Sequence, residues 1–192
     1  MEDQNYRTCD RGLLEGKSVN LKLVEKEDLP LLAEWSNDPK FLGEYIWLPQ
    51  QSRTEWEKRC DSLPPDTKWF FIEKKDGTKI GTMFHWPIGN FLEIGYVLIP
   101  GERRKGYCTE AVKIVLDYLF LSKDIVRVQA HTDARNVASQ KVLQNLGFKK
   151  EGIVRKSVFA RGEWRDRCLY SILREEWKEP KILTKTTSKS QT

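Results

Sequence analysis

The sequence has no apolar run close to the ~18 residues that a membrane-spanning helix needs. It also shows no secretory signal at its start, because Met1 to Gly12 are polar and carry charges of both signs. We therefore expect a cytoplasmic protein without a membrane partner.

Cysteine and histidine are scarce. No two cysteines form a C-x-x-C pair, and all four are widely separated: Cys9, Cys60, Cys108 and Cys168. This spacing predicts free thiols in a reducing compartment and argues against a zinc site or a disulfide framework. The two histidines, His85 and His131, are too few and too scattered for a metal site or a catalytic triad. We expect both to pack on strands, and we expect no bound metal.

The chain also lacks a strong excess of one charge. Its net charge is +5, and three of those charges lie after Pro180 in a stretch without acidic residues: Lys181, Lys185 and Lys189. A general nucleic-acid binder concentrates a larger basic excess on one face. We therefore expect no direct nucleic-acid partner.

The composition is that of one folded domain. Hydrophobic residues make up 39% of the chain and aromatic residues 11%, which is more than a disordered protein carries. A length of 192 residues suits a single domain with a sizeable core. We expect a loose leader at 1–12, one domain at 13–179, and a disordered tail rich in Lys, Ser and Thr at 180–192.

Hydrophobic periodicity and turn signals predict both strands and helices. Ser52 with Glu55 is a capping box at a helix start, Asp76-Gly77 is a hairpin turn, and Gly147 ends a helix. The expected strands are 19–23, 69–74, 79–86, 91–99, 125–130, 148–160 and 164–173, and the expected helices are 27–37, 52–63, 105–121 and 136–146. The order β-α-α-β-β-β-α-β-α-β-β predicts an α/β (α+β) domain. Its sheet would be mixed, mostly antiparallel, twisted and flanked by helices.

The most informative stretch joins a strand to a helix through a short basic loop that ends in Gly106. The first backbone N–H groups of a helix have no internal partner and lie at the positive end of its dipole, so they suit phosphates. Gly106 has no Cβ and lets the backbone approach a ligand closely. Positive charge comes from Arg103, Arg104 and Lys105. The loop is neither a P-loop nor a Rossmann G-x-G-x-x-G turn.

This loop and a second segment together resemble the GNAT N-acetyltransferase superfamily. The family's loop pattern Q/R-x-x-G-x-G/A is met at Arg103 and Gly106, with Cys108 in the last place. An N-x-x-S-x-x-x-x-x-x-x-G-F signature is filled by four later residues: Asn136, Ser139, Gly147 and Phe148. That signature is similar to the branch that contains the ribosomal-protein N-terminal (Rim-type) acetyltransferases. The resemblance covers roughly residues 15–175 and implies a single GNAT-like domain.

The resemblance implies how acetyl-CoA, the co-substrate, would bind. The pantetheine arm would pair with the free backbone of the strand before the loop, at Val97, Leu98 and Ile99. Asn136 would hydrogen-bond the same arm. The pyrophosphate would lie on the loop and the helix start, at Arg103, Arg104, Lys105, Gly106, Tyr107, Cys108 and Thr109.

The implied reaction is direct attack of a neutral primary amine on the acetyl thioester, and a base must first take a proton from the ammonium form. Glu93 is the candidate base, directly or through water, because it lies on the strand that meets the cofactor. Ser139 is the candidate donor to the leaving thiolate. We expect Tyr96 and Tyr107 to pack or to line the cofactor. A helix N-terminus lowers a thiol pKa, which would suit a nucleophilic Cys108, but the resemblance implies direct transfer.

The acceptor stays open at this point. The first expectation is an N-terminal α-amine of a protein or peptide, and the alternatives are a small amine (a polyamine or an antibiotic) or a non-catalytic module that binds CoA or RNA. An acidic pocket would favour a polycation, and an open groove would favour a peptide. Either a monomer or a homodimer is expected. We expect six tryptophans to lie either in the acceptor groove or in the core: Trp35, Trp47, Trp56, Trp69, Trp86 and Trp164.

Overall fold

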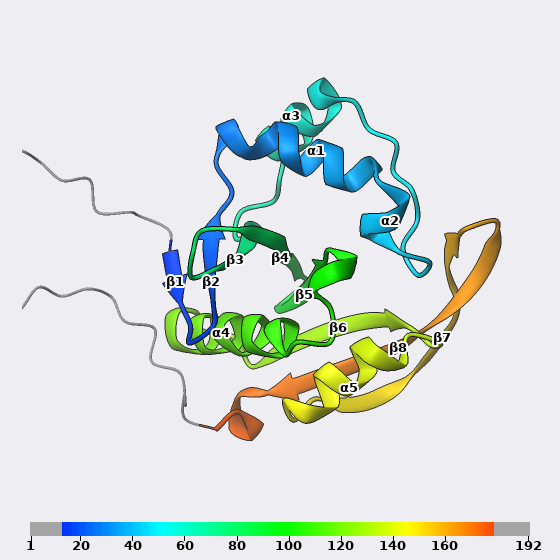
Figure 1. The fold of residues 1–192 in the computed structure, drawn as a ribbon. Helices are drawn as coiled ribbons and strands as arrows, with labels where there is room; N and C mark the ends of the chain where they lie inside the picture. Colours follow the sequence, from blue (N-terminus) through cyan, green and yellow to red (C-terminus); the bar gives the residue numbers. More distant parts are fainter. Residues whose placement is uncertain (1–12, 179–192) are drawn as a thin grey trace, which may run out of the picture.

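A computed structural model describes residues 13–178, which form one eight-stranded sheet with helices on both faces (Figure 1). The strands are β1 (Leu13–Glu15), β2 (Val19–Leu23), β3 (Lys68–Lys74), β4 (Lys79–Ile88), β5 (Phe91–Leu98), β6 (Arg127–Asp133), β7 (Lys149–Ala160) and β8 (Glu163–Leu173). The helices are α1 (Leu29–Asn37), α2 (Pro39–Leu42), α3 (Arg53–Asp61), α4 (Tyr107–Ser122) and α5 (Val137–Asn145), with short 3-10 turns η1 (Lys26–Asp28), η2 (Pro100–Glu102) and η3 (Arg174–Glu176). The expected leader at 1–12 and tail at 180–192 lie outside the described residues.

The order across the sheet is β1-β2-β3-β4-β5-β6-β8-β7. All neighbouring pairs among the described strands are antiparallel except β5 with β6, which run parallel. The expected mixed, mostly antiparallel sheet with helices around it is confirmed.

One face of the sheet packs on α4 and forms the larger core. Side chains alternate between the two faces of a strand, so Ile72, Met83 and Ile94 all point to this side. They meet the buried stripe of α4, which includes Ile114 and Leu119, and none of these five side chains is more than 2% exposed. Burying a side chain of this kind contributes about 1.5–3 kcal/mol, so this core carries much of the stability.

The other face packs on α1 and α3, which lie above the sheet in Figure 1. Leu32 of α1 and Trp56 of α3 are almost fully buried against Phe71 of β3. The predicted capping box starts α3: the Ser52 hydroxyl accepts from the Glu55 backbone N–H at 3.3 Å, and the Glu55 carboxylate accepts from the Ser52 backbone N–H at 2.7 Å. Both the hydrophobic contact with the sheet and the local capping box therefore stabilise α3.

Two short elements were absent from the expected order. β1 pairs antiparallel with β2, but a three-residue strand is too short to show a periodic pattern. α2 begins at Pro39, where the sequence predicts only the end of α1. The Asp38 side chain accepts from the Lys40 backbone N–H at 2.8 Å and caps this new turn. Proline is favoured at the first position of a helix, so it both ends α1 and starts α2.

β5 and β6 pair over only two positions, Leu92 with Val128 and Glu93 with Gln129. Beyond Glu93 the two strands diverge, while the opposite edge of β5 stays paired with β4 as far as Leu98. The sheet is therefore split on one side of β5, and α4 begins just beyond the end of that strand.

Arg174 in η3 caps the far end of α4. Its guanidinium donates to three backbone carbonyls, those of Phe120 at 2.8 Å, Lys123 at 2.5 Å and Ile125 at 2.7 Å. The last carbonyls of a helix have no intrahelical partner, and a cation there also suits the helix dipole. One side chain thus ties the end of α4 to the end of β8.

Replacement of Arg174 by Met should therefore lower the free energy of unfolding by about 2 kcal/mol or more, because charge-assisted hydrogen bonds are lost and carbonyls are left unpaired. Urea unfolding followed by circular dichroism would measure it. Arg155→Met is the matched control, since Arg155 is exposed on β7 and makes no hydrogen bond or ion pair within 13–178. Its change should stay within about 0.5 kcal/mol. Equal unfolding midpoints for the two variants would contradict the capping role.

Candidate functional site

The split edge of β5 exposes backbone groups of only some of the predicted residues. The Ile99 N–H donates to the Ile80 carbonyl of the β4 side at 3.0 Å. In an antiparallel pair, alternate residues direct their peptide groups to the partner strand. The peptide groups of Val97 and Ile99 therefore face β4, whereas those of Tyr96 and Leu98 face the gap. Of the three residues predicted to meet the pantetheine arm, only Leu98 presents its backbone there.

Arg103 is a structural clamp at the end of this strand. Its Nε donates to the Leu98 carbonyl at 2.9 Å, and its guanidinium also donates to the Phe41 carbonyl of α2 at 2.8 Å. Its own backbone N–H donates to Pro100 at 3.3 Å. Neither the side chain nor the amide is aimed at a phosphate, so the residue holds β5, the loop and α2 together.

The amides from Arg104 to Thr109 lie where the sequence predicts an anion site. Arg104 and Gly106 both have left-handed backbone, with φ of 64° and 84°, which turns the chain sharply into α4 and forms a concave run of N–H groups. Tyr107, Cys108 and Thr109 are the first three residues of α4, so their N–H groups have no partner within the helix. A phosphate would find both hydrogen bonds and the positive end of the dipole here.

The basic side chains of the loop differ in whether they already have an acidic partner. Lys105 is held by Glu102 at 3.0 Å, and Glu102 also binds Lys74 at 2.7 Å. These ammonium groups hold the pKa of the Glu102 carboxyl below its usual range. Arg104 makes no hydrogen bond or ion pair with the described residues, so its guanidinium is available to a ligand.

Cys108 lies at the start of α4 but not as an activated thiol. Burial raises its pKa to about 12, and the nearby Arg103 charge lowers it less than burial raises it. Desolvation of the charged form thus outweighs the pull of the helix N-terminus. This arrangement does not support a nucleophilic role for Cys108.

Asn136 and Ser139 lie together at the start of α5. The Asn136 side-chain oxygen accepts from the Ser139 backbone N–H at 3.0 Å and caps the helix, which leaves the amide nitrogen of Asn136 for another partner. The Ser139 hydroxyl lies 2.9 Å from the Tyr96 hydroxyl. Burial raises the pKa of Tyr96, so this phenol stays protonated. We expected Tyr96 only to pack or to line the cofactor, but it bridges the gap from β5 to α5.

Glu93 lies where the two strands begin to diverge, and it is 5% exposed. Its carboxylate accepts from the Gln129 side-chain amide at 2.9 Å, and His131 Nδ1 lies 3.0 Å from each of its oxygens. The expectation that His131 only packs is therefore wrong, because it is paired with the candidate base. Glu93 and Gln129 lie opposite one another in parallel strands, and this pairing is not visible in the sequence.

The other histidine behaves as predicted. His85 is fully buried, its ring centre lies 6.3 Å from that of Phe70 and 6.1 Å from that of Tyr118, and burial lowers its pKa to about 4. Within residues 13–178, no cluster of histidine, cysteine, aspartate and glutamate could hold a metal ion. The same part of the chain contains no helix long and apolar enough to cross a membrane.

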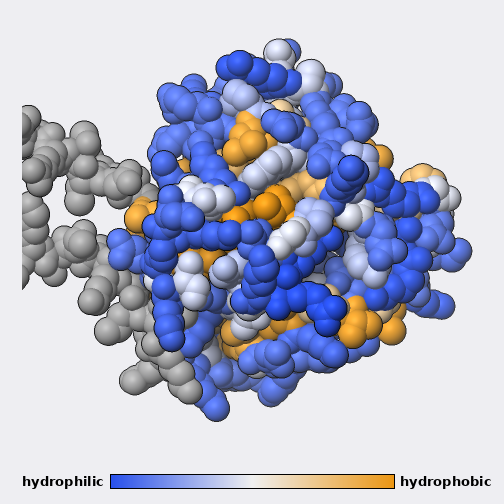
Figure 2. Space-filling view, viewed as in Figure 1, coloured by the Kyte–Doolittle hydropathy of each residue, from blue (hydrophilic) through white to orange (hydrophobic). Residues whose placement is uncertain are grey.

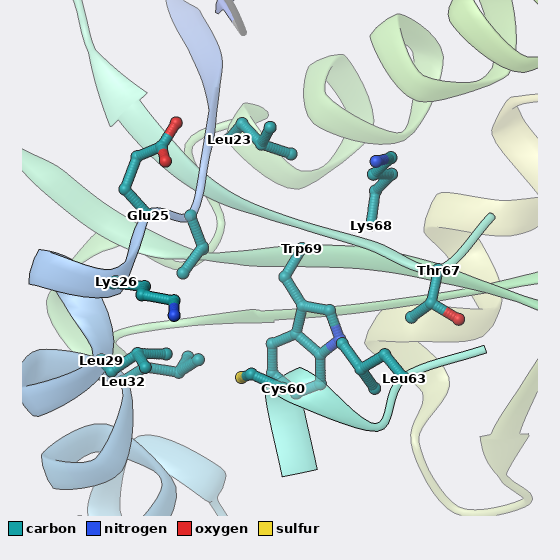
Figure 3. Close-up of a pocket in the computed structure, with 11 residues that line it drawn as sticks. Leu23, Glu25, Lys26, Leu29, Leu32, Cys60, Leu63, Thr67, Lys68 and Trp69 are labelled. Atoms are coloured by element: carbon teal, nitrogen blue, oxygen red, sulfur yellow. The ribbon is translucent and has the colours of Figure 1, made fainter. Parts of the chain in front are cut away.

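A cavity lies elsewhere, away from these residues. It measures about 200 Å³ under α1 and the end of α3, where Leu29, Leu32, Cys60 and Trp69 line it (Figure 3). Trp69 was a candidate for the acceptor groove, but none of the predicted cofactor-binding or catalytic residues lines this cavity. Figure 2 shows small apolar areas near the middle of this mostly hydrophilic face, between α1 and α4. The cavity is a gap in helix–sheet packing rather than part of the site around β5.

A comparison with protein families identifies an acetyltransferase domain. The model of the acetyltransferase (GNAT) domain matches residues 18–149, a stretch that includes β5, the loop before α4 and the start of α5. Among curated proteins, the probable N-acetyltransferase YjcK of Bacillus subtilis is 42% identical over 178 residues, which cover 84% of this chain and 97% of that protein.

Solved structures of two acetyltransferases share the fold. The ribosomal-protein-S5-alanine acetyltransferase of Vibrio fischeri matches with a TM-score of 0.72 and 25% identity, over 86% of this chain and 98% of that one. The spermidine N-acetyltransferase of Vibrio cholerae, in complex with CoA and spermine, matches with a TM-score of 0.75 and 21% identity, over 83% and 97%. The fold is thus shared with an acetyltransferase named for a ribosomal protein and with one named for spermidine.

The environment of Cys108 predicts slow alkylation in the folded protein. Each pKa unit above the reaction pH reduces the thiolate tenfold, so iodoacetamide near pH 8 should modify Cys108 at least about 100-fold more slowly in the native protein than in urea, where a thiol has a pKa of about 8.5. Peptide mass spectrometry would follow the modification with time, and the urea sample is the internal control. Labelling as fast in the native state would mean that Cys108 is activated.

Proposed function

The chain belongs to the GNAT family of N-acetyltransferases, and we propose that it transfers the acetyl group of acetyl-CoA to the N-terminal α-amine of a protein or peptide. The main support for this proposal is the split of the sheet at β5. The free N–H groups at the start of α4 lie just past one end of the split, and Glu93 lies where it opens. Acetyl-CoA needs hydrogen-bond donors for its pyrophosphate and a base close to its thioester, with an exposed strand edge between the two.

The described residues fit acetyl-CoA with one adjustment to the expected set. We place the pyrophosphate on the amides from Arg104 to Thr109, with Arg103 supporting the loop from behind through Leu98. The pantetheine arm would pair with the peptide groups of Tyr96 and Leu98. The free amide nitrogen of Asn136 would donate to a carbonyl of the same arm.

The two proton transfers of the reaction would take place on opposite faces of β5. Glu93 and Tyr96 are three positions apart, so their side chains lie on opposite faces of the strand. On one side, Glu93 belongs to the group that takes a proton from the acceptor ammonium, directly or through water. On the other side, the Ser139 hydroxyl, backed by the protonated Tyr96, would donate to the leaving thiolate. A backbone N–H of the exposed strand edge would stabilise the developing oxyanion.

Charge pairing around Glu93 supports a peptide acceptor over a polyamine. Asp133 is the nearest further acid on β6, and it is bound by Arg135 at 3.2 Å and by Arg165 at 3.5 Å. Glu163 on β8 binds the same two arginines. A polycation is best held by acids without partners, and these two have partners. An α-amine needs less help, because its pKa of about 7.7–8.0 leaves part of it neutral at pH 7.

An aromatic row beside Glu93 offers a surface for the acceptor. Trp86 lies opposite Glu93 in the β4–β5 pair, and its ring stacks on Phe84 with centroids 5.5 Å apart. Phe84 in turn packs against Gly95, where a Cβ would come within 2.5 Å of the ring. Of the six tryptophans, Trp86 is the one that lies beside the candidate base. We propose that its ring contacts the first residues of the peptide.

Measurement of acetyl-CoA binding tests the proposed role of the loop around Gly106. Gly106→Trp should weaken binding at least tenfold, because a large side chain would cover the amides. Gly77→Trp is the matched control: Gly77 has the same φ of 84° and the same open space, but lies in a hairpin turn. Both variants carry the strain of a non-glycine residue in this conformation, so only the position differs. Isothermal titration calorimetry on the native chain and both variants measures the effect; no binding by the native chain would refute the proposal.

Release of free CoA then identifies the acceptor. We expect turnover with peptides that have a free N-terminus and at least about tenfold lower kcat/KM with spermidine, an aminoglycoside or an N-terminally blocked peptide that contains lysine. The blocked peptide is the control for the α-amine. A preference for spermidine would overturn the peptide assignment and favour the small-amine alternative. Binding of acetyl-CoA without turnover on any acceptor would favour a non-catalytic module.

A further inference from the structure

Three polar side chains form a closed group on the face of the sheet opposite α4. Glu93 comes from β5, while Gln129 and His131 come from β6 and are two positions apart, so all three point to the same side. Gln129 and His131 both contact the Glu93 carboxylate, at distances of 2.9 and 3.0 Å. This group lies at the last paired position before β5 and β6 diverge.

The carboxylate is the inner member of the group and the imidazole is the outer one. The Glu93 side chain is 7% exposed and that of His131 is 16% exposed. An ionised carboxylate has no hydrogen to donate, so the hydrogen of the contact lies on His131 Nδ1. This places the lone pair of the neutral ring on Nε2. Within residues 13–178, Nε2 makes no hydrogen bond, and it is not among the polar atoms that are buried without a partner.

The charged groups that face this side from neighbouring strands are already paired. Asp133, further along β6, binds Arg135 and Arg165. Near the other end of β6, Arg127 binds Glu151 of β7 at 3.1 Å. On β8, the Arg167 guanidinium donates to the Ser157 hydroxyl at 2.9 Å. Glu93 is therefore the one charged partner of His131 among these groups.

We propose that His131 is the group that receives the proton of the acceptor, with Glu93 as the residue that positions it; this inference rests on the proposed acetyl transfer. His131 Nε2 takes a proton from the acceptor ammonium, which leaves a neutral amine and an imidazolium. The amine nitrogen then forms the bond to the acetyl carbon, and the carbon–sulfur bond breaks. The thiolate gains the second nitrogen proton by way of Ser139, and the imidazolium releases its proton to solvent.

The carboxylate gives the imidazole both its tautomer and its orientation. Because the lone pairs of Glu93 that face the site are taken by His131 and Gln129, an amine would reach the imidazole first. Positioned general bases of this kind raise rates by about 10²–10⁴-fold.

The test uses the full chain and the best acceptor found by CoA release. His131→Asn retains an N–H donor close to the position of Nδ1 and removes the ring base, so it should bind acetyl-CoA within about twofold of the native Kd and lose at least about 100-fold in kcat. Gln129→Leu is the matched control, because it removes the other hydrogen bond to Glu93 but no base, and it should lose less than about tenfold in kcat. A native kcat in His131→Asn would overturn the inference and leave the acetyltransferase assignment intact.

A double-mutant cycle separates positioning from direct catalysis by Glu93. If Glu93 acts through His131, Glu93→Gln should lower kcat strongly in the native protein and by less than about threefold in the His131→Asn background. Equal losses in both backgrounds would show that Glu93 takes the proton itself and would overturn the inference. Absence of acetyl-CoA binding by the native chain would overturn both proposals, and calorimetry distinguishes that outcome.

Discussion

The divergence of β5 from β6 after two paired positions is the constraint on which the rest of the site depends. Inside a sheet, the peptide groups along one strand normally form hydrogen bonds with those of the neighbouring strand. Here the groups of Tyr96 and Leu98 have no neighbouring strand, and Arg103 covers one of them, the Leu98 carbonyl. The remaining groups are a ready surface for a ligand rich in amides. Glu93 and Tyr96 lie on opposite faces of the sheet at this split, as the two proposed proton transfers require.

Arginine side chains that bind backbone carbonyls hold the surrounding segments in place. Arg103 connects the loop before α4 to α2, and Arg161 and Arg165 of the β7–β8 hairpin reach the carbonyls of Gly43 and Glu44, at 2.6 and 2.5 Å. In Figure 1 the hairpin extends beyond the rest of the sheet toward α2. The planar, permanently charged guanidinium suits this task because it donates in several directions at once. The segment after α2, the hairpin tip and the loop before α4 are therefore linked by hydrogen bonds.

The regular elements were predictable because their causes are local. Alternation predicted β2, the Asp76-Gly77 turn separated β3 from β4, and the Ser52 capping box predicted α3. A helix was expected from residue 105, close to the start of α4. β1 and α2 were missed because three or four residues carry no period. Glu93, Ser139 and Asn136 were named through a family resemblance, and the structure brings each near a partner that the sequence did not indicate. His131 meets Glu93 across a parallel strand pair, and Tyr96 meets Ser139 across the gap. Neither contact follows from spacing along the chain, because strand order and register are set by packing of the whole sheet.

By itself, the sequence determined most of the strands and helices, the approximate start of α4, and the family to which the chain belongs. These properties depend on residues within one or two turns of each other, where periodicity, capping and backbone conformation act. The tertiary structure alone decided that burial raises the pKa of the Cys108 thiol, that the Arg103 guanidinium donates to backbone carbonyls, and that His131 is joined to Glu93. Each of these depends on burial or on a partner distant in the sequence, and desolvation and hydrogen bonding in a packed interior are properties of the assembled fold.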